Sequence, residues 1–154
     1  MDAPLRFLAD AMLGTLARWL RILGYDTAYD AGLDDDGVVR LARGEGRIIL
    51  SRDTGFLPRK GVQVLYVTSE ILEQQIAQLL GAFRLPVDHP FSRCPVCNGV
   101  LKAVCKEEAR GQVPTYVLQT QPEFHLCPSC QRFYWRGTHW QGMWNRVSSL
   151  GGSE

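Results

Sequence analysis

The sequence predicts an α/β fold followed by a small β unit, and two observations lead to this prediction. In residues 1–84, short apolar segments of strand length alternate with longer segments whose apolar residues recur at helical spacing. Strands that alternate with helices pair in parallel, because each crossover returns the chain to the same strand direction. From Cys94 onward the chain is rich in Cys, Trp, Gly and β-forming segments such as "TYVLQT" and "RFYWRG", with no amphipathic helix that the spacing supports.

The chain opens with a strand, a helix and a second strand. The first strand is expected over residues 5–9 and the helix over residues 11–24, where Gly24 supplies the stop. The predicted buried stripe of this helix consists of Leu13, Leu16, Ala17, Leu20 and Leu23. The second strand is expected over residues 25–29.

A helix, two strands and a further helix follow, at residues 33–44, 47–51, 62–67 and 69–83. An acidic run opens the first of these helices and Gly44 ends it, while Ser69 opens the second. Residues 84–93 contain two prolines and continue neither pattern. They are expected to link two units, residues 1–84 and residues 91–147.

The overall composition is that of a soluble globular protein. The 154 residues are 45% hydrophobic and 21% charged, which argues against disorder, and the net charge of +1 decides little. No apolar run approaches the roughly 18 residues that span a bilayer, and the amino terminus lacks the apolar core of a signal peptide. We expect a cytoplasmic protein without a membrane partner. Because thiols stay reduced in that compartment, its cysteines are expected to take part in metal binding or catalysis and not in disulfides.

Two C-x-x-C segments, residues 94–97 and 127–130, are separated by 29 residues. Together they supply four thiolates, the tetrahedral set that suits a structural zinc ion, and the expected ligands are Cys94, Cys97, Cys127 and Cys130. A redox role is the competing interpretation, which two such segments outside the βαβ region disfavour. The segment between them would be a hairpin tip or an insertion. Cys105 is expected to be a buried free thiol, and His89, His125 and His139 to be ordinary surface or packing residues.

Aspartates follow two of the predicted strands. Asp10 comes after the first, and Asp53 comes after the strand at residues 47–51 with one residue between. Ligands of parallel sheets collect beyond the carboxyl ends of the strands, and carboxylates brought together there usually need a divalent cation. With the acidic run at residues 34–36, these positions predict a Mg²⁺ or Mn²⁺ site able to activate water against a phosphodiester.

Structural roles compete with each of these functional roles. Asp10 and the acidic run could cap helices, and Asp53 could belong to a polar turn. Arg18 and Arg21, three residues apart on a helix, together with Arg52, are candidates for phosphate contacts, although a solvated helix face is the favoured interpretation of the first two. The aromatic residues of the tail could stack on bases or cover a small core, namely Trp135, Trp140 and Trp144.

Three stretches carry a family resemblance over nearly the whole chain: "FLADAMLGTLARWLRILGYDT", "DDDGVVRLARGEGRIILSRDTGFL", and the two cysteine segments with "RFYWRGTHWQGM". They resemble the Mut-seven C-terminal RNase domain family. The resemblance implies a PIN-like parallel sheet flanked by helices, followed by a small β zinc ribbon. It also implies that Asp10 and Asp53 bind metal, as does Asp35 in the acidic run, with Asp36 next in preference. PIN-like relatives often carry a further acid where this chain has Gly55, and Asp30 is a candidate to fill that place.

The predicted function is therefore that of a metal-dependent ribonuclease. Asp10, Asp35 and Asp53 would hold Mg²⁺ or Mn²⁺ to activate water against RNA, and the zinc ribbon would position the strand. The alternative is a non-catalytic adaptor that binds RNA or protein through a degenerate PIN-like domain. A phosphotransfer domain with Asp10 as nucleophile is disfavoured, because no acid lies two residues further on.

Overall fold

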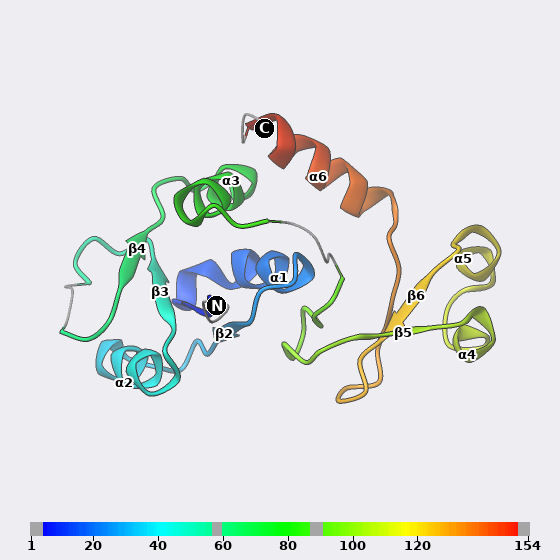
Figure 1. Cartoon of the computed structure of the whole chain (residues 1–154), viewed down its shortest axis with the longest axis horizontal. Helices are drawn as coiled ribbons and strands as arrows, with labels where there is room; N and C mark the ends of the chain where they lie inside the picture. Colours follow the sequence, from blue (N-terminus) through cyan, green and yellow to red (C-terminus); the bar gives the residue numbers. More distant parts are fainter. Residues whose placement is uncertain (1–4, 57–59, 87–90, 151–154) are drawn as a thin grey trace.

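The computed structural model describes residues 5–56, 60–86 and 91–150, which form an α/β part and a smaller antiparallel part (Figure 1). The α/β part contains β1 (Phe7–Ala9), η1 (Ala11–Leu13), α1 (Gly14–Ile22), β2 (Thr27–Tyr29), α2 (Asp35–Glu45), β3 (Ile48–Ser51), β4 (Val64–Tyr66) and α3 (Leu72–Phe83). The later elements are β5 (Lys102–Val104), α4 (Lys106–Ala109), α5 (Thr115–Thr120), β6 (Phe124–Leu126), β7 (Phe133–Tyr134) and α6 (Thr138–Leu150).

The predicted parallel sheet is confirmed, with strand order β2-β1-β3-β4. Alternate residues of the central strands face opposite sides, as the two-residue repeat of a strand requires. Phe7 and Ala9 pack with the buried residues of α1 and α3, whereas Leu8 packs with Val38 and Val39 of α2. Figure 1 shows α1 and α3 on one face of the sheet and α2 on the other. All four strands therefore direct their carboxyl ends to one edge.

Two predicted helix boundaries were wrong. Helix α2 runs past Gly44 to Glu45 and is capped by Gly46, which has a φ of 65° and so takes the left-handed conformation that glycine tolerates best. Helix α3 begins at Leu72, three residues after Ser69. The Ser69 hydroxyl accepts from the Ile71 N–H (2.9 Å) and thereby forms a turn ahead of the helix.

The predicted small β unit is present as a three-stranded antiparallel sheet, in the order β5-β6-β7. The segment "TYVLQT", expected as a β-forming segment, is helix α5 instead, so this prediction was wrong. Val117 of α5 is buried against Ala109 of α4 and Phe124 of β6, and packing there outweighs local β preference. Helices α4 and α5 thus form the insertion expected between the two cysteine segments.

Helix α6 corrects the expectation that the carboxyl-terminal part contains no amphipathic helix. Trp140, Met143 and Val147 lie on one face of α6 and are buried in the same cluster as Phe7 and Leu79. The Trp144 ring stacks on Trp140, with centroids 6.0 Å apart, and an ion pair joins α6 to α3 (2.7 Å). Figure 1 shows α6 lying beside α3, back on the α/β part. The division into residues 1–84 and 91–147 stays a prediction.

Polar side chains join the two parts at the first cysteine turn. Arg21 of α1, only 8% exposed, donates to the carbonyl oxygens of Thr27 (2.8 Å), Pro95 (2.8 Å) and Val96 (3.3 Å). The Asn98 side chain accepts from the Thr27 N–H (3.1 Å) and donates to the Asp26 carboxylate (2.7 Å). The first cysteine turn is thereby fixed against the start of β2. Within the described ranges, no helix is both long and apolar enough to cross a membrane.

Candidate functional site

Asp10 lies at the carboxyl edge of the sheet, between the ends of two neighbouring strands. The register that pairs Ala9 with both Tyr29 and Leu50 places Asp10 beside Asp30 on one side and beside Ser51 on the other. Its carboxylate accepts from the Met12 N–H (3.0 Å), which caps η1, and from the Ser51 hydroxyl (2.7 Å). Asp10 is a helix cap, as one prediction had it, and also part of a network at the strand ends.

Ser51 connects the two aspartates that the sequence singled out. Its fully buried side chain donates to Asp10 and accepts from the Asp53 N–H (3.0 Å). The Asp53 carboxylate accepts from the Gly55 N–H (2.8 Å), which closes a turn, and its side chain is exposed. The structure therefore brings Asp10 and Asp53 to the same edge and links them through one hydroxyl.

The other predicted acids lie in the turn after β2 and at the start of α2. Asp30 follows β2 and accepts from the Gly32 N–H (2.9 Å), whereas Asp34 caps α2 by accepting from the Gly37 N–H (2.8 Å). Asp35 and Asp36 are exposed in the first turn of α2. Among the residues that the structure describes, these aspartates do not form a group of three close enough to hold an ion.

The predicted phosphate-binding arginines differ in exposure. Arg18 is exposed on α1, but Arg21 is buried and donates to three carbonyl oxygens, so the two do not share an exposed face. Burial lowers the pKa of Arg21. Arg52 is half-buried and donates to the Val67 carbonyl (3.4 Å). Arg21 joins the two parts of the protein, and its phosphate contact stays a prediction.

The four cysteines of the two C-x-x-C segments come together as expected. All their sulfur atoms lie within 4.8 Å of one another, and Cys94–Cys130 and Cys97–Cys127 are each 3.5 Å apart. Zn–S bonds of about 2.3 Å in a tetrahedron place sulfurs about 3.8 Å apart, which matches this spacing. The cluster is therefore able to hold a metal ion such as zinc, and its donor set suits a structural role.

The two cysteine turns share one backbone design. In each, the residue after the second cysteine has positive φ and donates its N–H to the first cysteine's carbonyl at 2.8 Å: Asn98 (φ 71°) to Cys94, and Gln131 (φ 64°) to Cys127. The N–H of Cys94 donates to the Gly99 carbonyl, and the N–H of Cys127 donates to the Arg132 carbonyl. These bonds hold each pair of thiols on one side of its turn.

Side chains around the cluster favour a thiolate at Cys94. Burial would raise the pKa of Cys94, but hydrogen bonds from the Tyr134 hydroxyl (3.0 Å) and from the N–H groups of Cys97 and Val96 lower it to about 7. Burial and the neighbouring thiols raise the pKa of Cys130 to about 12. Four thiolates cannot coexist here without a cation, since like charges repel at these distances.

Two smaller predictions have different outcomes. Cys105 is exposed, so the expectation of a buried thiol was wrong. His125 is half-buried, stacks on Phe91 with centroids 6.4 Å apart, and lies outside the cysteine cluster, as a packing residue should. His89 and the His139 side chain lie outside the described part.

Three residues that shape these sites were not among the predicted site residues: Ser51, Asn98 and Tyr134. A hydroxyl at the end of an apolar strand signals Ser51, and asparagine directly after a C-x-x-C segment suits a left-handed residue. Tyr134 carries no such signal, because only the folded sheet brings its hydroxyl to Cys94.

Comparison with known proteins gives one match. The family model described as the Mut7-C RNAse domain matches residues 5–147, nearly the whole chain, including the sheet-edge aspartates and the four cysteines. No curated protein and no solved structure matches. The chain belongs to the Mut7-C RNAse domain family.

Proposed function

We propose that the protein is a metal-dependent ribonuclease whose chemistry takes place at the carboxyl edge of the parallel sheet. The observation that carries the proposal is the network in which Ser51 joins Asp10 to Asp53. Membership of a family described as an RNAse domain supports this choice of activity.

The proposed metal ligands are Asp10 and Asp53, with Asp30 in the turn after β2 and Asp35 in the first turn of α2 as candidates to complete the set. Mg²⁺ usually takes one or two carboxylates together with waters and substrate phosphate, so it does not require a cage of three acids. Each carboxylate accepts up to about four hydrogen bonds and retains acceptor sites beyond those already used. The ion would activate water and neutralise charge on the phosphodiester.

Zinc held by Cys94, Cys97, Cys127 and Cys130 is proposed to have a structural role. A closed set of four thiolates leaves no open position for a reacting water. The zinc-bearing turn would fix the ribbon against α1 and β2 through Arg21 and Asn98, and would thereby hold the RNA-binding surface in place. We expect about one zinc per chain by elemental analysis.

The test is cleavage of labelled single-stranded RNA with Mn²⁺, with Mg²⁺, or with no added divalent ion. Asp10→Asn and Asp53→Asn are compared with Asp34→Asn, which preserves the α2 cap because asparagine caps as well as aspartate. We expect both sheet-edge variants to lose at least roughly a hundredfold in rate, since each removes a metal-binding charge. The Asp34 variant should remain active.

A non-catalytic RNA- or protein-binding adaptor is the second candidate. One observation favours it: the aspartates of the described ranges form no three-acid cluster. The family resemblance also implies a further acid at the position where this chain has Gly55. RNA binding without cleavage in either metal would support the adaptor. Metal-dependent cleavage that Asp10→Asn abolishes would exclude it.

A further inference from the structure

Two clefts lie end to end along α1, where the ribbon meets the α/β part. The first, of about 340 Å³, is lined by Gly14, Arg18, Tyr29 and Pro95, among others. The second, of about 350 Å³, is lined by Arg18, Pro95 and Trp135 together with other aromatic residues. Because Arg18 and Pro95 border both, we treat the clefts as one feature, the α1 groove.

The α1 groove begins at the proposed catalytic edge. Tyr29 directly precedes Asp30, and its hydroxyl donates to the Ala11 carbonyl (2.9 Å) in the turn that follows Asp10. From Gly14 to Ile22 the groove follows α1 for about 12 Å, at 1.5 Å per residue. A chain lying in this groove would therefore lead away from the sheet edge toward the ribbon.

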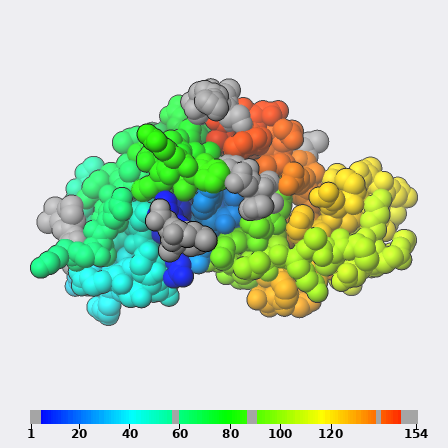
Figure 2. Space-filling view, in the orientation of Figure 1, coloured from blue at the N-terminus to red at the C-terminus, as the bar shows by residue number. Residues whose placement is uncertain are grey.

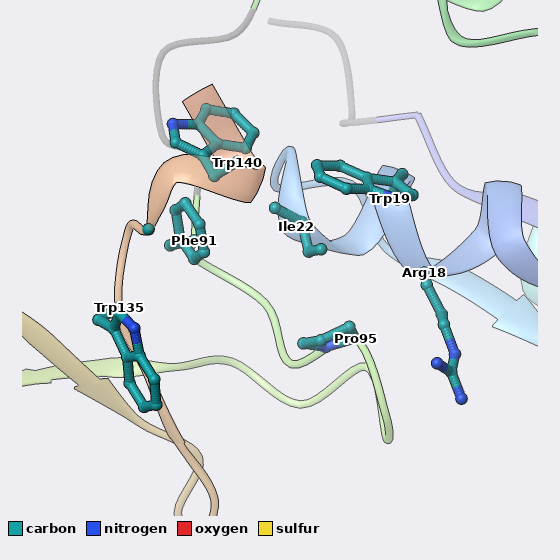
Figure 3. A pocket seen from close by; sticks show the side chains of 8 residues that line it. Arg18, Trp19, Ile22, Phe91, Pro95, Trp135 and Trp140 are labelled. Carbon is teal, nitrogen blue, oxygen red and sulfur yellow. The ribbon is translucent and has the colours of Figure 1, made fainter. Parts of the chain in front are cut away.

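The far end of the groove has a flat apolar lining. Figure 3 shows Trp135, from the segment between β7 and α6, on one side, with Pro95 and Ile22 across the gap and Arg18 at the margin. Trp135 is half-buried and packs edge-on to Phe124 at 6.3 Å between centroids. Aromatic side chains accept unpaired bases of any identity by stacking.

The charge of the lining favours an anionic ligand. Arg18 is exposed where the two clefts meet, and among the described residues that line either cleft there is no carboxylate. In the space-filling view the ribbon stands out from one side of the α/β part (Figure 2). Fixed aromatic surface beside an exposed guanidinium is the combination that single-stranded nucleic acid uses.

We propose that the α1 groove binds the single-stranded part of the RNA substrate, with one unpaired base against Trp135 and a backbone phosphate at Arg18. This rests on the proposed ribonuclease function and specifies its substrate. A duplex could not insert a base beside Trp135, so the enzyme should require unpaired nucleotides on one side of the cut.

The test is the affinity of the zinc-loaded full chain for a fluorescent single-stranded RNA and for the same RNA in a duplex. Binding is measured by anisotropy without added Mg²⁺ or Mn²⁺, and the probe is checked for cleavage on a gel. Arg18→Ala and Trp135→Ala are compared with Arg40→Ala on α2 and Tyr116→Ala on α5, which remove an exposed arginine and an exposed aromatic ring elsewhere.

We expect Trp135→Ala to weaken single-strand binding by roughly tenfold or more, the loss usual for one stacked base. Arg18→Ala should also reduce the slope of log affinity against log salt by about 0.7, the value for one phosphate contact on a single strand. Both control variants should bind as the wild type does. Arg18→Ala changes only a surface side chain, so its result stands even if Trp135→Ala unfolds the ribbon.

Equal affinity for single strand and duplex, or an unchanged salt slope in Arg18→Ala, would overturn the groove assignment. If the protein gives either of these results but still cleaves RNA in a reaction that needs Asp10, the proposed ribonuclease function stands and only the groove assignment fails. Conversely, the groove variants could weaken RNA binding while the wild type cleaves RNA in neither metal. That result would contradict the ribonuclease function and would still support the groove as the RNA-binding site.

Discussion

At the scale of single residues, Gly99 shows how closely the backbone approaches the cysteine cluster. A Cβ added there would lie 3.3 Å from the Cys97 sulfur and 3.4 Å from the Cys127 sulfur. We expect Gly99→Ala to push these sulfurs apart and to weaken zinc affinity by up to roughly tenfold. Competition with a chromogenic chelator measures this. Gly44→Ala, with no atom within 4 Å of the new Cβ, is the matched control, and equal zinc release by the two variants would argue against close packing at Gly99.

Asp26 is a second residue with a measurable role. Burial would raise its pKa, but hydrogen bonds from Asn98 and Arg47 prevail and lower it below the ordinary value of 3.8. A carboxyl whose pKa is lowered by folding stabilises the fold at pH values above its unfolded-state pKa. This stabilisation is lost as the pH falls through the folded-state pKa.

We therefore expect Asp26→Asn to reduce the free energy of unfolding by about 1–2 kcal/mol at pH 7. The difference from wild type should shrink as pH falls below 3.8 and through the folded-state pKa, because the wild-type carboxyl then becomes protonated as well. Urea unfolding at several pH values measures both effects, and Glu107→Gln, in an exposed ion pair, is the control. A loss that does not change with pH would show that charge is not the cause.

At the scale of elements, α6 is attached to the α/β part mainly by apolar contacts. Met143 is 6% exposed and lies in the main core cluster. We expect Met143→Ala to lower the free energy of unfolding by about 2–3 kcal/mol, as buried methionine truncations do. Asn145→Ala, on the exposed side of α6, should have little effect. Urea unfolding measures both variants. Equal losses of unfolding free energy in Met143→Ala and Asn145→Ala would show that α6 does not pack as described.

The α/β elements could be predicted from the sequence because their signals are local and agree with one another. The stripe from Leu13 to Leu23 has clear helical spacing, and all five of its predicted residues are buried. Helix α6 also has a local signal, an apolar stripe at i, i+3, i+4 and i+7 that consists of Trp140, Met143, Trp144 and Val147. The prediction missed this signal because it gave more weight to the Trp and Gly content of the segment, as an indication of a β unit. The partner surface of α6 on α3 is more than 50 residues away in the chain.

The candidate site was predictable to a similar degree. Parallel pairing alone places Asp10 and Asp53 at one edge, and two C-x-x-C segments are sufficient to predict a four-cysteine cluster. By contrast, nothing in the spacing of Arg18 and Arg21 shows that the second is buried. That difference depends on where the cysteine turn docks, which is a contact between residues more than 70 apart.

At the scale of the whole molecule, the cysteine turn and the parallel sheet are directly bonded. The Thr27 N–H at the start of β2 donates to Asn98, which sits in the turn. Removal of zinc should free this turn, so we expect chelation to speed hydrogen exchange at the Thr27 amide while Leu8 and Ile49 in the sheet centre stay protected. Exchange followed by NMR measures this. An unchanged Thr27 rate after verified zinc loss would mean that the ribbon and sheet are held together independently of the ion.

The most direct test of the proposed chemistry is the Mn²⁺-dependent cleavage rate of single-stranded RNA by wild type and by Asp10→Asn, at equal zinc content and equal RNA binding. Metal-dependent cleavage that falls by at least roughly a hundredfold in the variant is the expected result, because Asp10 would hold the ion. Equal rates in the two proteins, or no cleavage by either, would contradict a catalytic site at the sheet edge.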